Sequence, residues 1–423
     1  MPIPASSKSI GTAPHSGSGV LSDDARRRDW RRHVALLLES HPTPFFLFSA
    51  EPITSALREL DATFSALPVT QWLSVKTQPL PAMVRWWNSQ KRPVEVVSRL
   101  EYELASQAGV PAARLLVNGP AKQAWLRSVS RTGIRVNFDS VAEVRALASI
   151  AKREKWVVGL RCNTASEFDP ESPKHPTQFG MSEAELTTAV LLLRKTGIEP
   201  HVLHFHLRTN VARHEVYRTA ISEAFRMAAK ARFHPSVLDI GGGFPAPHVK
   251  GMRGWNVDQH FSLQEMKHAL ARTIQDHASV KEIWLENGRW LSARSGVLVT
   301  RILDIKERRG MRSLICDGGR TLHAMPSCWE QHDMTSLPRR VGPSILSTVN
   351  GPTCMAFDKL FRGMLPNSLR VGDALIWLDA GAYHLSWETR FSHGAAAVFW
   401  KEGKLTRCVR DPEDFQTWNQ QWK

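Results

Sequence analysis

Between residues 71 and 290 the chain alternates short apolar runs with longer amphipathic runs, and this alternation constrains the fold more than any other feature. The short runs are typical of strands and number eight: Gln71–Lys76, Val94–Ser98, Arg114–Asn118, Ile134–Asp139, Trp156–Asn163, His201–Arg208, Ser236–Gly241 and Glu282–Glu286. Helical patterns lie between most of them, at Ala82–Gln90, Glu101–Ala108, Val141–Lys152, Glu183–Lys195 and His214–Ala231. This series predicts an α/β fold, a closed TIM-like (β/α)8 barrel, although an open doubly wound sheet has the same order of elements.

Polar residues at the strand ends favour the barrel. The predicted strands end at or beside Lys76, Ser98, Asn118, Asp139, Asn163, His206, the glycines after Asp239, and Glu286. In a barrel these ends converge on one mouth, where catalytic residues gather, whereas in an open sheet they would spread along an edge.

After residue 296 the pattern changes to strands separated by turns. These are Gly296–Glu307, Arg312–Cys316, Ser344–Val349, Ala374–Leu378, Ala395–Lys401 and Lys404–Arg410, and they predict a mostly antiparallel β domain. The extended segment Pro44–Phe48 is a candidate for the same sheet. We therefore expect three regions: a disordered or helical tail (1–40), the barrel (41–295) and a C-terminal β domain (296–423).

The net charge of +15 indicates an anionic partner or ligand. No nucleic-acid-binding motif accompanies the charge, and no apolar run approaches the ~20 residues of a membrane span, so we expect neither nucleic acid nor membrane as a partner. The arginines at 26–28, 31 and 32 are expected to form a solvated helix face.

The cysteines and the N-terminus bear on compartment and metals. Five scattered cysteines (Cys162, Cys316, Cys328, Cys354 and Cys408) lack metal-ligand spacing, so no metal site is expected. The Ser/Gly/Pro-rich segment Met1–Leu21 has no apolar core of a secretory signal. Both features predict a reduced, cytoplasmic protein.

Three motifs carry candidate chemistry. Lys76 ends an apolar strand, where burial would lower the pKa of its amine and make it a nucleophile for a Schiff base, unless the side chain reaches solvent. The run Gly241-Gly242-Gly243 follows a strand and can offer backbone N–H groups to a phosphate, or form a plain turn. Glu286 and Arg289 close the last barrel strand, where they can pair with a protonated ring nitrogen and an anion, or form a surface salt bridge.

Together, and in this order, the motifs resemble the fold-type III pyridoxal 5'-phosphate (PLP) decarboxylases, the ornithine, arginine and diaminopimelate decarboxylase group with its alanine-racemase-like barrel. The resemblance extends from about residue 42 to 400. It implies that Lys76 binds PLP as a Schiff base and that His206 stacks on the cofactor ring. It further implies cofactor contacts for Thr209, Gly241, Gly242, Gly243, Glu286, Arg289 and Tyr383, and substrate contacts for Asp358, Met355 and Arg289. Cys354 matches a catalytic cysteine that a partner subunit inserts, which implies a homodimer with shared active sites.

Two departures from that pattern concern the substrate. Met325-Pro326 stands where diaminopimelate decarboxylases carry Arg-Pro, and Met355 stands where they carry a glutamate after the cysteine. Both charged anchors for a zwitterionic distal end are missing, so we do not expect diaminopimelate itself. Asp358 is compatible with ornithine- or lysine-like substrates, and the basic charge is compatible with a substrate bound to an acidic carrier protein.

The main expectation is an amino-acid decarboxylase, and three alternatives stay open. A racemase or epimerase needs a second base opposite Lys76, typically tyrosine, and the chain has only Tyr102, Tyr217 and Tyr383. A non-catalytic PLP-binding homologue would resemble a lone barrel. An inactive relative is suggested by Arg208, which stands where the family has glycine, and by Met355.

Overall fold

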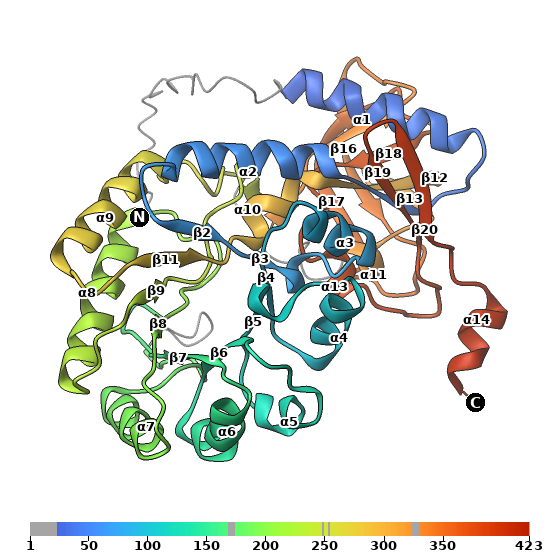
Figure 1. Ribbon diagram of the computed structural model, residues 1–423. Coiled ribbons are helices and arrows are strands. Elements are labelled where there is room, and N and C mark those ends of the chain that lie inside the picture. Colours follow the sequence, from blue (N-terminus) through green and yellow to red (C-terminus); the bar gives the residue numbers. More distant parts are fainter. Residues whose placement is uncertain (1–22, 168–173, 248, 253, 324–329, 423) are drawn as a thin grey trace, which may run out of the picture.

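A barrel and a second β-sheet lie side by side in the computed structural model, which describes residues 23–167, 174–247, 249–252, 254–323 and 330–422 (Figure 1). The barrel sheet runs in the order β2 (Val69–Gln71), β11 (Glu282–Leu285), β9 (Val237–Asp239), β8 (Val202–His204), β7 (Val157–Arg161), β6 (Arg135–Phe138), β5 (Leu115–Val117), β4 (Val94–Val96) and β3 (Leu73–Ser74). Every neighbouring pair is parallel.

The barrel is closed by one strand that is interrupted at Trp72. The strand's first part, β2, pairs with β11, and its second part, β3, pairs with β4. Between them the Trp72 N–H donates to Leu285 O (2.8 Å) and the Leu73 N–H donates to Pro93 O (3.1 Å). The nine strand segments are therefore eight barrel strands, and the predicted (β/α)8 barrel is confirmed.

Helices cover the outside of the barrel. They are α2 (Ala50–Phe64), α3 (Pro81–Ser89), α4 (Arg99–Gln107), α5 (Leu126–Val129), α6 (Val141–Arg153), α7 (Glu183–Lys195), α8 (His214–Lys230), α9 (Leu263–Asp276) and the short α10 (Gly288–Ser292). Serine side chains cap five of them: Ser98, Ser140, Ser182 and Ser262 each accept a hydrogen bond from the N–H three residues on, and Ser49 accepts one from the Glu51 N–H. Ser98, predicted as a polar residue of the mouth, thus caps α4. Within the described residues no helix is long and apolar enough to span a membrane.

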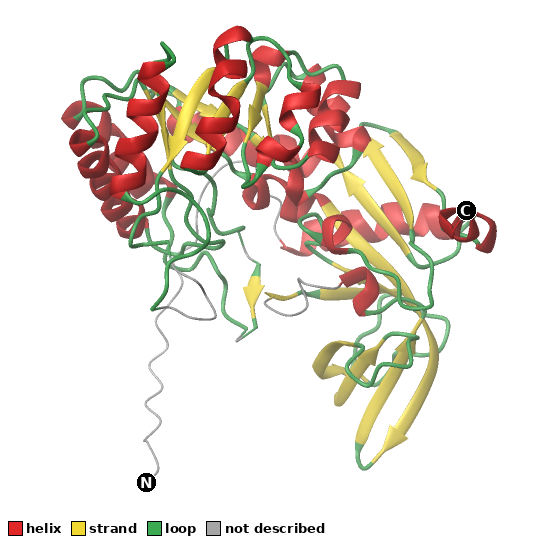
Figure 2. Ribbon diagram, turned by 90° about the horizontal axis from the view of Figure 1, so that it is seen from below, coloured by secondary structure: helices red, strands yellow, loops and turns green. Residues whose placement is uncertain are grey.

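The second sheet combines both ends of the chain, and its strands extend away from the barrel in Figure 2. Its order is β17 (Lys359–Pro366), β16 (Ser344–Asn350), β13 (Met311–Cys316), β12 (Gly296–Arg308), β1 (Phe45–Ser49), β19 (Ala397–Glu402) and β20 (Leu405–Arg410), while β18 (Ala374–Trp377) pairs with β12 and β15 (Met334–Leu337). Most pairs are antiparallel, and β1–β19 and β13–β16 are parallel. Because β1 lies inside this sheet, the range 41–295 expected for the barrel includes one strand of the second sheet.

The N-terminal helix α1 (Asp23–Leu38) packs on the second sheet. Trp30 and Val34 are buried in one apolar cluster with strands β1, β12, β18 and β19. The basic residues of this helix were expected to face solvent, which is only partly correct. Arg26 forms a buried ion pair with Asp379, and the Arg31 Nη1 donates to Thr335 Oγ1 (3.0 Å). Residues 1–22 lie outside the described part of the chain.

We predict that Arg26→Ala lowers the free energy of unfolding by ~3–5 kcal/mol, because it leaves the Asp379 carboxylate buried without its guanidinium partner. Arg32→Ala is the control on the same helix, since its pair with Asp29 is exposed (70% and 44%) and should contribute less than ~0.5 kcal/mol. Chemical denaturation of both variants measures the difference. Equal stability of the two would show that α1 does not depend on this pair.

Candidate active site

Lys76 lies at the mouth of the barrel in a 3-10 turn, Val75–Thr77, rather than on the strand as predicted. Its Nζ donates to Glu95 Oε2 (3.1 Å) and lies 3.5 Å from Oε1. Glu95 is fully buried on β4 between Val94 and Val96. A buried carboxylate is costly without a positive partner, so Glu95 fixes the position of the Lys76 amine.

The sequence suggested a neutral Lys76 amine, and the contacts with Glu95 indicate a protonated one instead. Burial lowers the pKa of the amine, as the sequence suggested, but the neighbouring carboxylates of Glu95 and Glu286 outweigh burial and hold the pKa above its ordinary value. With no other ligand in the mouth, Lys76 is therefore an ammonium group. It becomes a nucleophile only after it transfers this proton.

Glu286 follows β11 and is buried at the centre of the mouth. The Asn118 Nδ2 donates to its Oε1, and His204 Nε2 lies 3.8 Å from that same oxygen. Burial raises the pKa of Glu286 well above its ordinary value, and the neighbouring Asp239 raises it further. Burial likewise raises the pKa of Asp239, to about 7. Two carboxyl groups are thus close together in a dry site and are suited to a cationic ligand.

His206 is held by the glycine run. The Gly242 N–H donates to His206 Nδ1 (3.1 Å), so the neutral ring carries its proton on Nε2. A Cβ on Gly241 would lie 2.4 Å from the same nitrogen, and one on Gly242 would lie 2.3 Å from Glu286 O. Burial, with the positive charges of Lys76 and Arg161, lowers the pKa of His206 well below its usual value.

The glycine run was predicted to direct its N–H groups at a phosphate, and two of the three are used otherwise. The Gly241 N–H donates to Asp239 Oδ1 (3.0 Å) and the Gly242 N–H to His206, whereas no bond within the described residues uses the Gly243 N–H. Gly243 has φ +93°, which favours glycine. The main role of Gly241–Gly243 is therefore to hold the His206 ring, and only the Gly243 N–H remains for an anion.

Arg289 is buried beside the mouth and has a partner that the sequence did not predict. Its Nη1 forms an ion pair with Glu330 on β14 (Glu330–Gln331), and its Nε donates to Thr209 Oγ1 (3.1 Å). The guanidinium lies 4.8 Å from the centre of the Tyr383 ring. The structure thus brings Arg289, Thr209 and Tyr383 together, as the resemblance implied, but with one carboxylate already bound to the arginine.

The second domain contacts the turn that carries Lys76. The Tyr383 N–H donates to Thr77 O (2.6 Å), and the Ser386 hydroxyl donates to the Lys76 carbonyl oxygen. Ser386 belongs to α13 (His384–Trp387), which follows β18. Positioning of the lysine therefore depends on both domains.

The segment that carries Cys354 lies between β16 and β17. Cys354 is exposed, Met355 is half-buried, and no hydrogen bond or ion pair of the described residues connects either side chain with the Lys76 turn. Asp358 is buried, and its oxygens accept bonds from the Arg320 N–H (2.7 Å), the Thr353 N–H (3.1 Å) and the Thr353 hydroxyl (2.6 Å). These bonds make Asp358 the centre of a turn, and its contact with substrate stays a prediction. Met325 and Cys328 lie outside the described residues.

Three acids of this region were missed by the sequence reasoning. Glu95 had a signal, because a carboxylate between two valines of a barrel strand must face the barrel interior or solvent. Asp239 stood in the glycine motif without an assigned role. Glu330 gave no local signal, since its partner Arg289 is 41 residues away.

The residues of the mouth fit PLP. Within the described residues no lysine or arginine forms an ion pair with Glu286 or Asp239, and a protonated ring nitrogen would supply that positive charge. His206 offers a fixed flat ring, and the free Gly243 N–H and the Thr209 hydroxyl are donors for a phosphate group. Lys76 provides the amine.

Comparison with known proteins agrees with this geometry. Residues 51–293 match the family model described as the pyridoxal-binding domain of pyridoxal-dependent decarboxylases. The chain is 24% identical over 372 residues to a lysine/ornithine decarboxylase of Selenomonas ruminantium, covering 85% of this chain and 90% of that protein. It is 26% identical over 389 residues to the L-glutamyl-(BtrI acyl-carrier protein) decarboxylase of Niallia circulans, covering 84% and 87%.

Among solved structures, the diaminopimelate decarboxylase of Helicobacter pylori, complexed with L-lysine, shares the fold. It superposes with a TM-score of 0.78 at 21% identity, over 92% of this chain and 99% of that one. The family match covers more than half of the chain and includes the whole barrel mouth. The chain is a member of the pyridoxal-dependent decarboxylase family.

Proposed function

We propose that this protein decarboxylates an amino acid or an amino-acid derivative, with Lys76 as the residue that holds PLP covalently. The observation that carries the proposal is the charge arrangement of the mouth, where one ammonium group, Lys76, stands among Glu95, Glu286 and Asp239. A site with this excess of buried carboxylates is suited to a cofactor that brings a protonated ring nitrogen.

The residues divide the work as follows. PLP, when bound, supplies an electron sink for the electron pair that the departing carboxylate leaves behind. Glu286 would hold the ring nitrogen of the bound cofactor and favour its protonated form. His206 presents its ring to the cofactor because the Gly242 N–H fixes its plane. Lys76 exchanges its proton with Glu95, whose Oε2 lies within hydrogen-bonding distance (3.1 Å), and later returns a proton to the substrate carbon.

The contacts and the burial of the three tyrosines favour decarboxylation over racemisation. Tyr383 stacks on Arg289. The Tyr217 hydroxyl donates to Gly242 O (2.8 Å), and burial raises its pKa. Tyr102 is buried on α4, where burial raises its pKa to about 12. These contacts support decarboxylation, because a racemase needs a tyrosine that is free to act as the second base.

We propose that the active unit is a homodimer in which Cys354 of one subunit completes the site of the other. In support of this, Cys354 is exposed on a turn of the second domain and has no bonded partner in the described part of its own chain. Diaminopimelate is not the substrate that we propose, because Met355 provides no charge for its distal end.

A carrier-bound substrate is the second candidate, supported by one of the relatives above and by an arginine-lined cavity. The cavity has a volume of about 310 Å³ and lies between α1 and β15. Five arginines line it (Arg27, Arg28, Arg31, Arg339 and Arg340), with Asp24 as the one acid among its lining residues. Acidic carrier proteins are complementary to such a surface.

We predict that Lys76→Ala and Lys76→Arg both abolish the visible absorption band of bound PLP and reduce CO2 release at least ~10³-fold. Arginine keeps a cation beside Glu95 but cannot bind the cofactor covalently, so Lys76→Arg should retain wild-type thermal stability. Absorption spectra and a CO2-release screen of D- and L-amino acids provide the measurement. A band that persists in Lys76→Arg would assign the cofactor to another residue.

We predict that Glu286→Gln has opposite effects on stability and function. At pH 8 the cofactor-free variant should be more stable than wild type by ~1–3 kcal/mol, because the neutral amide removes a carboxylate whose pKa burial raises. The gain should vanish near pH 4, since a carboxyl group with a raised folded pKa stabilises the fold at low pH and loses this contribution as pH rises. PLP affinity should fall at least ~10-fold and kcat ~10²–10³-fold.

Unfolding curves at both pH values, with PLP titrations, test the paired effects. A variant that loses stability at pH 8 would contradict the charge arrangement. Asn118→Ala is the control, because it removes the hydrogen bond to Glu286 Oε1 without removing the carboxylate; it should weaken PLP binding without stabilising the cofactor-free protein.

For the carrier candidate, we predict that Arg28→Glu combined with Arg339→Glu weakens binding of an acidic acyl-carrier protein at least ~10-fold, while CO2 release from a free amino-acid substrate is unchanged. Both arginines line the cavity and are exposed. Arg32→Glu, on the same helix but outside the cavity lining, is the matched control. Binding that is insensitive to salt or to the double substitution would exclude this role for the cavity.

A further inference from the structure

Three histidines form a cluster inside the second domain, behind the residues that contact the barrel mouth. His323 ends α11 (Arg320–His323), His332 lies between β14 and β15, and His384 begins α13. Each is at most 5% exposed. One nitrogen from each ring lies within 4.8 Å of the other two, and the ring centres are 4.5–5.2 Å apart. We refer to these residues as the three-histidine cluster.

Backbone carbonyls fix the tautomers of two of the rings. His332 Nδ1 lies 2.7 Å from Leu378 O, and His384 Nδ1 lies 3.1 Å from Ala382 O. A carbonyl oxygen can only accept, so Nδ1 carries the proton in each ring and, in the neutral ring, Nε2 carries the lone pair. Histidines that bind a metal are commonly held this way, with one N–H on a backbone carbonyl and the other nitrogen facing the ion.

Each of these Nε2 atoms lies close to another possible ligand atom. His332 Nε2 lies 3.2 Å from Glu330 Oε2, and the other oxygen of Glu330 is bound by Arg289. A lone pair opposite an ionised carboxylate oxygen is repulsive unless a cation or a proton lies between them. His384 Nε2 lies 2.6 Å from His323 Nδ1, which donates to it when that nitrogen carries the proton; with the proton on His323 Nε2, both nitrogens carry lone pairs and can bind one ion. Three imidazole nitrogens thus lie within 4.8 Å of one another, and Glu330 places a carboxylate oxygen beside one of them, His332 Nε2.

We propose that the three-histidine cluster, together with Glu330, binds a divalent transition metal ion of the zinc class. Imidazole nitrogen with one carboxylate oxygen is a donor set that zinc accepts in tetrahedral coordination, whereas Mg²⁺ and Ca²⁺ prefer all-oxygen sites. Zn–N bonds of ~2.0 Å set the ligand nitrogens ~3.3 Å apart, so small movements of the three rings from their present spacing suffice, while the Glu330 carboxylate would have to turn toward the ion as the fourth ligand. Because all four ligands come from protein, the site is of the closed, structural kind.

The ion has a defined place in the architecture. It would connect α11, the segment before β15 and α13, which are far apart in the sequence. Glu330 joins the cluster to Arg289, and His384 follows Tyr383, whose ring lies under that arginine. The metal therefore positions the second-domain side of the mouth without touching substrate. This assignment reverses the expectation of no metal, which considered only cysteine and short cysteine–histidine spacings.

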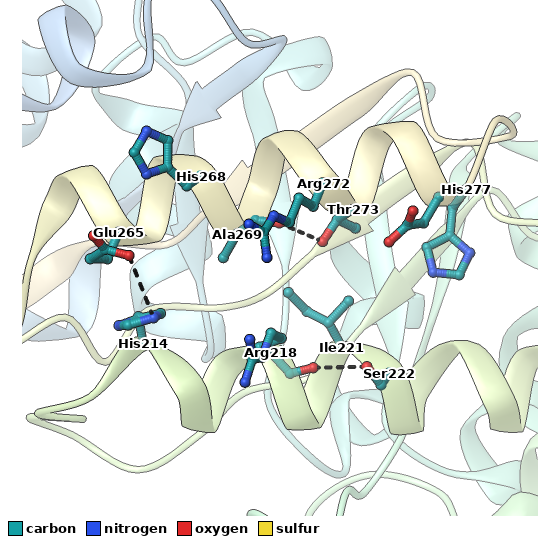
Figure 3. Close-up of a pocket in the computed structure, with 11 residues that line it drawn as sticks. His214, Arg218, Ile221, Ser222, Glu265, His268, Ala269, Arg272, Thr273 and His277 are labelled. Carbon is teal, nitrogen blue, oxygen red and sulfur yellow. Dashed lines mark hydrogen bonds and ion pairs between the residues drawn. The ribbon is translucent and has the colours of Figure 1, made fainter.

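The matched control is a second group of histidines in the outer groove between α8 and α9. His214, His268 and His277 line a cavity of about 310 Å³ there, and Figure 3 shows them distributed along the two helices. His214 lies 3.9 Å from Glu265, but these side chains form no group of converging ligand atoms in the described structure. His268→Ala, at an exposed position, should leave the metal content unchanged.

The test is elemental analysis of the full-length, PLP-loaded protein, purified without a histidine tag. We expect about one zinc ion per chain in wild type and in His268→Ala, and at least tenfold less in His332→Ala and His384→Ala. If these two variants fail to fold, the wild-type protein decides: chelation should lower the Tm by ~5 °C, and Zn²⁺ but not Mg²⁺ should restore it. Co²⁺ added to the chelated protein should give the intense visible bands of tetrahedral coordination.

Three results would overturn the proposal. The first is a metal content well below one ion per chain that zinc supplementation does not raise. The second is a Tm that chelation does not change. The third is a nitrogen NMR spectrum of the untreated protein in which both His332 nitrogens carry protons, which would show that an imidazolium–Glu330 pair occupies the place of the ion. None of these results bears on Lys76, so failure here is separate from failure of the decarboxylase proposal.

Discussion

The charge arrangement at the barrel mouth is the constraint on which the site depends. Glu95, Asp239 and Glu286 are each at most 3% exposed, and Lys76 is the ammonium group among them. Removing carboxylates from water in this number is unfavourable unless cations or shared protons compensate. Burial raises the pKa of Glu286 and of Asp239, the direction that favours a proton or a cation at this pair. A ligand with a protonated ring nitrogen would bring positive charge to these carboxyl groups. The site therefore favours binding of such a ligand at the expense of the stability of the unliganded fold.

This arrangement needs the second domain. The Lys76 turn is held by the Tyr383 N–H and the Ser386 hydroxyl, both from the segment after β18. Arg289, which begins the passage from the barrel to that domain, is bound on the far side by Glu330. A lone barrel with the same eight strands would lack these contacts. The family-typical pairing of a barrel with a β domain is therefore a requirement of the site and not only of the fold.

The sequence predicted what depends on local periodicity. All eight barrel strands are present, and α7 begins and ends where the pattern placed it, because a helix with a capping serine and a periodic apolar face is specified within a dozen residues. The strands β14, β15 and β17 were missed. β14 has two residues, and the pairing partners of β15 and β17 decide their conformation. Glu330 and the three-histidine cluster were missed for the same reason, since their partners lie far away in the chain.

The glycine run shows why a motif can be recognised while its physical role is misread. Three glycines after a strand suggested an anion cradle, yet a side chain at Gly241 would collide with the His206 ring and one at Gly242 with the backbone of Glu286. The glycines are needed because ring, carboxylate and backbone share one small volume. Only the Gly243 N–H of this run is left for an anion, so in the proposed phosphate site Thr209 would supply a further hydrogen bond and Arg289 the positive charge. Arg289 binds Glu330 through Nη1 and Thr209 through Nε, so a single guanidinium group connects this edge of the mouth to the second domain.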